Sequence, residues 1–482
     1  MDRRRTKIVA TLGPATDQPG TLKKLVEAGL DAARLNYSHG AQSDHAARAA
    51  AVRQVARECG REVGIIADLQ GPKIRIECFR DGAIELKPGD PFVIDAECAS
   101  DDGDAQRVGV TYKSLATDVK AGDTLLIDDG RLALNVTRVD GMAIKTEVSI
   151  GGKLSNNKGI NLQGGGLSAP ALTDKDLADL KHALDLSVDY VAVSFPRTAR
   201  DIESARQLIH SHNANAAIIA KMERAEALDN ADEIIKAADC IMIARGDLGV
   251  EIGDARLPPA QKQLIKKARA QHRVVITATQ MMDSMIDSPM PTRAEVMDVA
   301  NAVLDGTDAV MLSGETSVGA YPDLAVAAMS RVCGGAESDW IEQRSGPRRE
   351  MSFERVDQAI AMSAIYCGNG IGVKAIAALT ESGTTPLWMS RINTDIPIFA
   401  LASHAETLRR VTLYRDVYPL EFDINTVAYS EVTHAVLSLL KAQGAVEDGD
   451  RVIITKGDLH GHSGGTNGMK IVTVGDFVEH VG

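Results

Sequence analysis

Eight short apolar segments, separated by stretches with a helical pattern, constrain the fold of this 482-residue chain more than any other feature. Each segment is rich in Val, Ile, Leu and Ala, and each gives way to polar residues where it ends. The segments span residues 6–13, 32–40, 63–71, 189–196, 217–223, 240–247, 273–280 and 308–315. Such runs are typical of parallel strands buried on both faces. Eight strand–helix units predict a (β/α)8 barrel, and the alternative is an open doubly wound sheet, for which a GxGxxG turn is missing.

The alternation breaks between Pro72 and Leu167. Short strand-like runs are separated there by turn sequences such as KPGD, KAGD and DDG, at the spacing of a small β-barrel. We therefore expect a β-barrel lid domain of residues 72–167, inserted after the third barrel strand. The barrel itself comprises residues 1–71 and 168–346, and a helix resumes after Thr173, a suitable N-cap.

A third unit is predicted over residues 347–482, after a polar stretch that includes EQRSGPRRE. Its candidate strands span residues 374–382, 396–403, 417–422, 451–458 and 470–476. Helical segments alternate with these strands. The pattern predicts an α/β domain whose open parallel sheet has helices on both faces.

Charge and composition limit the partners of the chain. The net charge of −13 argues against nucleic-acid binding, because phosphate backbones reward a basic face. No apolar stretch approaches the ~20 residues that span a bilayer, and the N-terminus does not resemble a signal peptide. The six cysteines form no CxxC pair. We expect a cytoplasmic protein whose substrate can still be a small anion, held by local Arg and Lys residues.

Polar side chains stand at the end of most of the apolar segments, and Lys221, Glu223 and Asp247 carry the clearest chemistry. The carboxyl ends of barrel strands meet at one rim. Two carboxylates there suit Mg²⁺, and an ammonium beside them can stabilise an oxyanion. Arg34 can bind a phosphate through its two-pronged guanidinium. The pattern indicates phosphoryl transfer or enolate stabilisation; salt bridges of the carboxylates with Lys221 and Arg245 are the alternative.

At this point a resemblance becomes specific. The chain resembles the pyruvate kinase family along nearly its whole length. The matching motifs are TKIVATLGPAT (6–16), RLNYSHG (34–40), DLQGPKIR (68–75), NKGINL (157–162), IIAKMER (218–224), IMIARGDLGVE (241–251), TATQMMDSM (277–285), the run at 291–322 and LTESGTT (379–385). The resemblance implies a barrel with an inserted β domain and a C-terminal α/β domain. It also implies phosphoryl transfer from phosphoenolpyruvate to ADP, the last step of glycolysis, with Mg²⁺ or Mn²⁺.

The resemblance assigns roles to rim residues by motif. Those expected to act on phosphoenolpyruvate or its metal are Arg34 (phosphate), Lys221 (transition state and enolate), Glu223 and Asp247 (Mg²⁺), Gly246 and Thr279 (carboxylate) and Ser313 (proton relay). Those expected to face ADP or ATP are Asn36, His39, Arg75 and Lys158. Because Lys158 lies in the inserted domain, that domain would close as a lid. The family also implies a homotetramer.

Two positions depart from the pattern of family members that need K⁺. Asn36, Ser38 and Asp68 of that site are present, but Leu69 replaces a Thr and Lys73 replaces a Glu. An ammonium can stand in for the ion, since a unit charge ~4 Å from an anion contributes about 4 kcal/mol at intermediate dielectric. We therefore expect an enzyme that does not require K⁺. The alternative is that Lys73 points to solvent.

The LTESGTT loop predicts a second phosphate site. Its candidate phosphate-binding residues are Thr380, Ser382, Gly383, Thr384 and Thr385, close to an expected helix N-terminus. In the family this position binds a phosphorylated allosteric effector, and Lys456 with Ser463–Asn467 would complete the pocket. A sugar monophosphate, AMP and fructose 1,6-bisphosphate remain equally open. The alternative is a simple capped loop.

Two other functions compete with a kinase. An Mg²⁺-dependent lyase or aldolase acting on a pyruvate enolate would use the same rim residues, but it would have no use for Arg75, Lys158 and the inserted domain. A catalytically silent sugar-phosphate sensor would use only the last domain. The intact set of Lys221, Glu223 and Asp247 argues against that reading.

Overall fold

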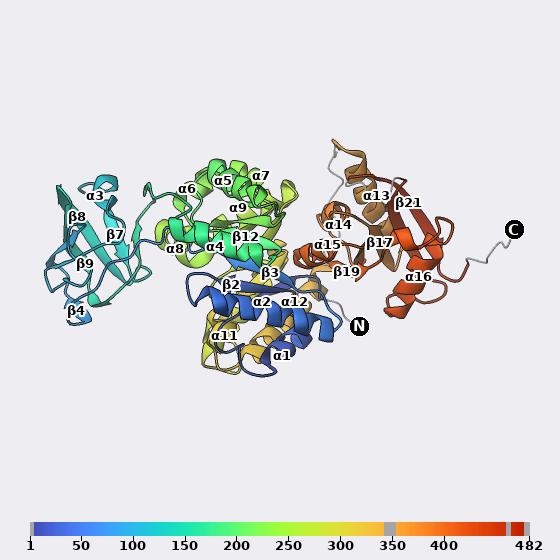
Figure 1. Ribbon diagram of the computed structural model, residues 1–482, viewed down its shortest axis with the longest axis horizontal. Coiled ribbons are helices and arrows are strands. Elements are labelled where there is room, and N and C mark those ends of the chain that lie inside the picture. Colours follow the sequence, from blue (N-terminus) through green and yellow to red (C-terminus); the bar gives the residue numbers. More distant parts are fainter. Residues whose placement is uncertain (1–3, 342–352, 459–463, 477–482) are drawn as a thin grey trace.

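The computed structural model describes residues 4–341, 353–458 and 464–476. Three parts lie in a row, with the inserted β domain at one end, the barrel in the middle and the C-terminal domain at the other end (Figure 1). The expected boundary at residues 346 and 347 lies outside the described residues. No helix within the described ranges is both long and apolar enough to cross a membrane.

The eight apolar segments form a closed parallel barrel, as predicted. Its strands, in the order in which they pair, are β1 (Lys7–Thr11), β16 (Ala309–Leu312), β15 (Val274–Ala278), β14 (Cys240–Ala244), β13 (Ala217–Met222), β12 (Tyr190–Val193), β3 (Gly64–Asp68) and β2 (Ala32–Asn36). Pairing between β2 and β1 closes the ring. The doubly wound alternative is excluded, because an open sheet has two edges and this one has none.

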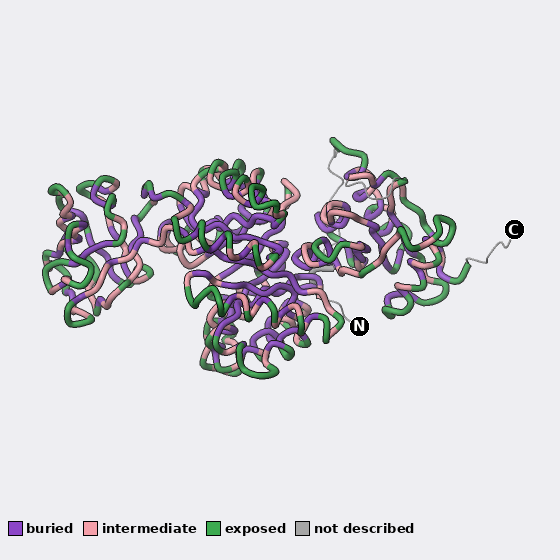
Figure 2. Tube along the Cα trace, in the orientation of Figure 1, coloured by how far each residue is buried: buried purple, intermediate pink, exposed green. Residues whose placement is uncertain are grey.

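Helices surround the barrel and bury its outer face. The principal ones are α1 (Thr21–Ala28), α2 (Gln42–Glu58), α4 (Asp174–Asp185), α5 (Ala199–Ser211), α7 (Ala231–Ala237), α9 (Leu257–Ala270), α10 (Arg293–Asp305) and α12 (Pro322–Ile341). Buried residues are concentrated along the barrel strands (Figure 2). Thr173 caps α4 as predicted, since its hydroxyl accepts from the backbone N–H of Asp176 at 3.2 Å.

The inserted domain is all-β, as predicted, but it pairs as two sheets rather than as one closed barrel. The larger sheet has the order β11 (Ile160–Leu162), β7 (Thr124–Ile127), β8 (Leu132–Asp140), β9 (Ala143–Ile150), β5 (Pro91–Asp95) and β6 (Arg107–Val108). The barrel does not close because β10 (Gly152–Ser155) pairs with β4 (Ala83–Leu86) instead. Arg75 and Gly159 bridge the two ends of the domain.

The C-terminal sheet is mixed rather than purely parallel. Its order is β19 (Val417–Glu421), β18 (Ile398–Ala402), β17 (Ala375–Leu379), β20 (Arg451–Gly457) and β21 (Thr466–Thr473). The first four strands are parallel, as predicted, but β21 is antiparallel to β20. The connection over residues 458–465 is too short for a parallel crossover, which takes about a dozen residues or more.

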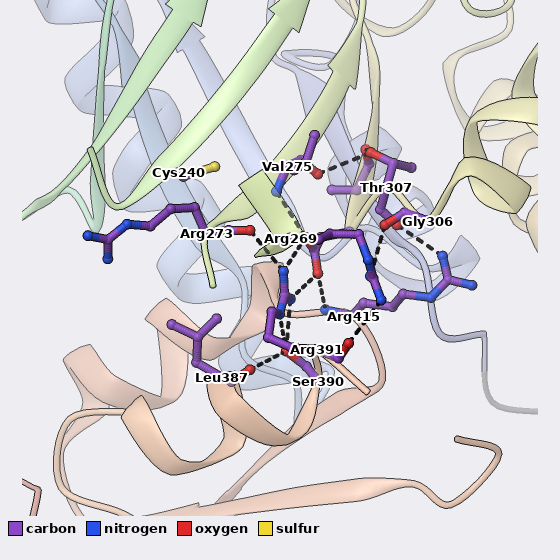
Figure 3. A network of polar contacts seen from close by, with 12 residues as sticks. Cys240, Arg269, Arg273, Val275, Gly306, Thr307, Leu387, Ser390, Arg391 and Arg415 are labelled. Atoms are coloured by element: carbon purple, nitrogen blue, oxygen red, sulfur yellow. Dashed lines mark hydrogen bonds and ion pairs between the residues drawn. The ribbon is translucent and has the colours of Figure 1, made fainter. Parts of the chain in front are cut away.

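The C-terminal domain packs against the amino-terminal ends of the barrel strands, which we call the floor. Arg391 follows α14 (Thr384–Met389) and reaches Asp308, immediately before β16, with Nη1–Oδ2 at 3.0 Å (Figure 3). Its Nη1 also donates to the carbonyl of Arg273 at 2.8 Å. Arg415 donates to the Thr307 carbonyl at 3.0 Å. Charged side chains therefore join the two domains within a buried contact.

Candidate active site

Lys221 is the centre of a buried charge cluster at the opposite end of the barrel, which we call the rim. It lies in β13, and its Nζ is 2.8 Å from Glu223 Oε1, 3.2 Å from Asp68 Oδ1 and 2.7 Å from Ser194 Oγ. Burial alone would lower the pKa of the ammonium, but the charges of Asp68 and Glu223 outweigh it and raise the pKa. Lys221 is therefore held as a cation.

Asp68, at the end of β3, joins Arg34 of the neighbouring β2 to Lys221 of β13, which lies beyond β12. Arg34 Nε lies 2.6 Å from Asp68 Oδ2, and Arg34 Nη1 donates to the hydroxyl of Thr11 at 3.0 Å. Burial would raise the pKa of Asp68, but the two cations lower it overall. An ionised carboxylate thus fixes both cations with their charged ends at the rim.

Glu223 and Asp247, the two predicted metal ligands, come shortly after β13 and β14, as the sequence predicted. Glu223 comes directly after β13, and the backbone N–H of Phe195 donates to its Oε2 at 3.0 Å. Asp247 lies in the first turn of α8 (Arg245–Ile252), and Lys73 Nζ is 3.0 Å from its Oδ1. Burial raises the pKa of Glu223; the charge of Lys221 opposes this rise and that of Asp247 adds to it.

The alternative role for the two carboxylates, salt bridges with Lys221 and Arg245, is found only in part. Glu223 does pair with Lys221, but Arg245 does not pair with Asp247. Arg245 Nη1 is 2.7 Å from Asp298 Oδ2, and Arg245 Nη2 donates to the carbonyl of Thr279 at 2.7 Å. Arg245 therefore shapes the loop after β15.

That loop is strained where Thr279 stands. Thr279 and Gln280 both have positive φ, 68° and 51°, and for the β-branched Thr279 this is a genuine outlier. The Thr279 hydroxyl accepts from the backbone N–H of Gly246 at 2.8 Å. Strain of this kind costs of order 1–3 kcal/mol and is characteristic of functional sites. Gly246 and Thr279, predicted to act together, are in direct contact.

Three polar residues at predicted strand ends have structural contacts in place of contacts with the rim cluster. The backbone N–H of Ser313 donates to Glu315 Oε2 at 2.6 Å, and Glu315 also accepts from Met282 N at 3.1 Å, so Glu315 organises the loop after β16. The Thr277 hydroxyl donates to that of Thr307 at 3.0 Å and is buried. Ser313 and Lys221 are not hydrogen-bonded to each other.

The residues predicted to face the nucleotide divide between the rim and the inserted domain. Asn36 Oδ1 accepts from the backbone N–H of Ser38 at 3.1 Å. Burial lowers the pKa of His39, and the positive charges of Arg75, Arg34 and Lys73 lower it further. Lys158 is turned away, with its Nζ 2.8 Å from Asp128 Oδ1 within the inserted domain.

Lys73 does not point freely to solvent, which was the alternative for this position. Its ammonium pairs with Asp247, while both Asp68 oxygens are engaged by Arg34 and Lys221. Leu69 is buried and offers no side-chain oxygen. The structure thus brings Lys73 to the predicted metal ligand rather than to Asp68.

The LTESGTT loop lines a cavity of about 50 Å³ in the C-terminal domain. Its walls include Thr380, Ser382, Thr384 and Thr385 from the loop, together with Lys456, Gly464 and Thr466. Gly383 has a φ of 81° and donates its N–H to the Thr380 hydroxyl at 3.0 Å. The Thr385 hydroxyl is buried against that of Thr466 at 2.8 Å. Ser463 lies outside the described residues.

Sequence reasoning missed the contribution of β12. Ser194 and Phe195 follow this strand and contact Lys221 and Glu223, yet neither was singled out. The signal was present, because Ser194 is a polar residue directly after an apolar run. Thr11, which binds Arg34 from the end of β1, was missed in the same way.

Comparison with known proteins agrees with this geometry. A family model described as "Pyruvate kinase, barrel domain" matches residues 3–326, and one described as "Pyruvate kinase, alpha/beta domain" matches residues 358–472. "Pyruvate kinase II" of Salmonella typhimurium is 54% identical over 98% of this chain and 99% of its own. Pyruvate kinase of Haemophilus influenzae is 52% identical over 94% and 96%.

A solved structure extends the agreement to three dimensions. The crystal structure of a pyruvate kinase from Cryptosporidium parvum superposes with a TM-score of 0.89 at 35% identity, over 98% of this chain and 96% of that one. Full-length identity above one half, both family domains and the same overall fold lead to one conclusion. The chain belongs to the pyruvate kinase family and is a phosphotransferase that converts phosphoenolpyruvate and ADP to pyruvate and ATP.

Proposed function

We propose that Lys221 stabilises the charge that develops on the transferring phosphoryl group and on the enolate. The observation that carries this assignment is its buried ammonium, held as a cation within 3.2 Å of three acceptors. Phosphoryl transfer depends mainly on positioning and on positive charge. A fixed cation in a site from which water is largely excluded acts more strongly than one in solvent.

Arg34 binds the phosphate in this proposal, since its guanidinium is oriented by Asp68 and Thr11 while other N–H groups remain for a ligand. The substrate carboxylate lies against Gly246 and Thr279, whose loop is held by Arg245. Ser313 relays a proton to the enolate. Its backbone N–H is held by Glu315, so the side-chain hydroxyl is not used by that contact.

Glu223 and Asp247 are the residues that would hold Mg²⁺ or Mn²⁺. No group of three or more His, Cys, Asp or Glu suited to a metal occurs among the described residues. Two carboxylates nevertheless fit Mg²⁺, which keeps several waters and takes other ligands from its substrates. When bound, the ion neutralises phosphate charge and orients the reacting oxygens. Asp247 can bind the ion through this oxygen only after the Lys73 ammonium has moved away from it.

Nucleotide binding is assigned to Asn36, His39, Arg75 and Lys158, with closure of the inserted domain as a lid. The lowering of the His39 pKa by the charges of Arg75, Arg34 and Lys73 supports this assignment. Closure would also have to free Lys158 from Asp128. The homotetramer and the domain boundaries expected from the sequence stay predictions.

Independence from K⁺ is proposed on the basis of Leu69 and Lys73. The test compares activity with KCl and with tetramethylammonium chloride at constant ionic strength, in the natural protein and in Lys73→Glu. We expect equal activity for the natural protein and a gain of K⁺ dependence in the variant. Strong activation of the natural protein by K⁺ would contradict the proposal.

Allosteric activation is proposed at the cavity of the LTESGTT loop. Among the residues that line it, Lys456 carries a positive charge and Glu381 a negative one, which favours an effector with a single phosphate over a bisphosphate. AMP, ribose 5-phosphate and fructose 1,6-bisphosphate are the probes. An unchanged response to all three in Thr384→Ala would refute the site.

A coupled assay of pyruvate formation from phosphoenolpyruvate separates the kinase from its rival, the Mg²⁺-dependent lyase or aldolase. The kinase requires ADP and forms ATP in step with pyruvate. Turnover of phosphoenolpyruvate to pyruvate without ATP would overturn the residue roles given above.

A further inference from the structure

Ser194 is buried between Lys221 and the segment that leads from β3 into the inserted domain, residues 69–72, which we call the linker. We propose that Ser194 is a positioning residue, which ties the orientation of the Lys221 ammonium to that linker. The inference rests on the catalytic role proposed for Lys221. It adds a residue that touches no reacting atom and acts only through Lys221.

The direction of the Ser194 hydroxyl is fixed by its two contacts. Ser194 is 1% exposed; its Oγ donates to the carbonyl of Leu69 at 2.7 Å and accepts from Lys221 Nζ at 2.7 Å. A hydroxyl has a single hydrogen. Because that hydrogen goes to Leu69, a lone pair must face Lys221.

Ser194 differs from the other partners of Lys221 in having no charge. Asp68 and Glu223 hold the ammonium through their negative charges, which also offset the field that it offers to a substrate. A neutral acceptor orients one N–H of the ammonium without weakening the field that the ammonium offers to a substrate. Ser194 therefore contributes direction, while the carboxylates keep Lys221 protonated.

The Leu69 carbonyl, which accepts the hydrogen of the Ser194 hydroxyl, belongs to the linker. Leu69 directly follows β3, and the chain leaves the barrel at Gly71 and Pro72. Gly71 has a φ of 66°, and a Cβ added there would lie 2.7 Å from Ser194 Cβ. Its N–H donates to Asp176 Oδ1 at 2.9 Å, which anchors it to α4. A shift of the linker must therefore displace Ser194 or its acceptor.

The next residue supports Glu223 by a separate route. Phe195 has a φ of 55°, uncommon for a bulky residue, and its backbone N–H holds Glu223. Substitution of Ser194 by Ala keeps this backbone contact. The substitution thus removes the orienting hydroxyl alone.

A double-mutant cycle tests the proposal in the full-length protein with Mg²⁺. We expect Ser194→Ala to lower kcat about 10- to 100-fold, the effect of losing a hydrogen bond to a charged group, with the KM for ADP little changed. In a Lys221→Met background the same substitution should lower kcat by less than about threefold. An unchanged kcat in Ser194→Ala, or equal losses in both backgrounds, would overturn the inference.

Two controls separate this outcome from other failures. Thr307→Val deletes a buried hydroxyl that donates to the carbonyl of Val275 at 3.1 Å on the floor, and it should leave kcat unchanged. If Ser194→Ala does not fold, Ser194→Cys supplies a weak acceptor of similar size and should show the same loss. A Lys221→Met variant with normal kcat would refute the proposed role of Lys221 itself.

Discussion

The barrel buries charged side chains at both ends, and the two clusters differ in what completes their contacts. On the floor, Asp308 accepts from the backbone N–H of Val275 at 2.9 Å and of Arg415 at 3.3 Å, besides its pairing with Arg391. At the rim, Asp68 is held by two side chains, Arg34 and Lys221. Backbone donors are fixed in place, whereas charged side chains can exchange a partner for a ligand.

Exposure follows the same division. The side chains of Arg391 and Asp308 are 2% and 0% exposed, while those of Arg34 and Lys221 are each 11% exposed. The floor pair is closed to solvent, whereas the two rim cations keep some contact with it. Burial of charge alone therefore does not distinguish the two clusters; the exposure of the cations and the nature of their partners do.

Breaking the floor pair should have the largest effect on stability. Arg391→Ala leaves Asp308 buried without its cation, so we expect the free energy of unfolding to fall by about 3–5 kcal/mol. Urea unfolding followed by circular dichroism measures the change. Lys181→Ala breaks the exposed pair with Asp185 and should cost less than about 1 kcal/mol. Similar losses in both variants would erase the distinction between buried and exposed pairs.

Breaking the rim cluster should affect catalysis more than folding. Lys221→Met should lower kcat by roughly 10²–10³-fold, equivalent to about 2.7–4 kcal/mol. Its free energy of unfolding should fall less than that of Arg391→Ala, because Asp68 keeps Arg34 and Glu223 can take up a proton. Steady-state kinetics and urea unfolding of the same sample test both parts. A rim variant that unfolds as readily as the floor variant would contradict the comparison.

A smaller and pH-dependent effect is expected at Asp416 on the floor. Burial raises its pKa to about 7, although Arg5 and Lys7 oppose the shift. A raised pKa in the folded state means that the stabilising contribution is complete at low pH and is lost as pH rises through about 7. Asp416→Asn removes this loss, and Asn tolerates the φ of 63° found there.

We therefore expect the stability of Asp416→Asn relative to the natural protein to rise between pH 4 and pH 7 and to level off above that range. Urea unfolding of both proteins across this range provides the measurement. A difference that does not vary with pH would mean that Asp416 stays ionised throughout. The floor would then resemble the rim, where neighbouring cations keep Asp68 ionised.

Much of the fold could be predicted from the pattern of apolar residues alone. The eight barrel strands were predicted because each is a continuous apolar run that ends at polar residues. The direction of β21 was missed because the strand was expected to begin at Lys470, whereas it begins at Thr466. With the earlier start, the short connection from Gly457 would have required an antiparallel hairpin.

The candidate site was predicted as far as strand ends could show it. Lys221, Glu223 and Asp247 were expected at one rim; Lys221 pairs there with Glu223 and Asp68, and Asp247 pairs with Lys73. The pairing of Lys73 with Asp247, 174 residues apart, depends on how the linker is placed, and no local pattern encodes it. The contact of Arg391 with Asp308 likewise depends on how the two domains pack.

The bridge between Arg75 and Gly159 has a consequence for how the barrel folds. Strands β3 and β12 are neighbours in the barrel, although the whole inserted domain separates them along the chain. Loop-closure entropy grows only with the logarithm of length, and a domain whose ends already meet acts as a short connection. The insertion point is thus a place where evolution can gain, lose or exchange a whole module without disturbing the order in which the barrel strands pair.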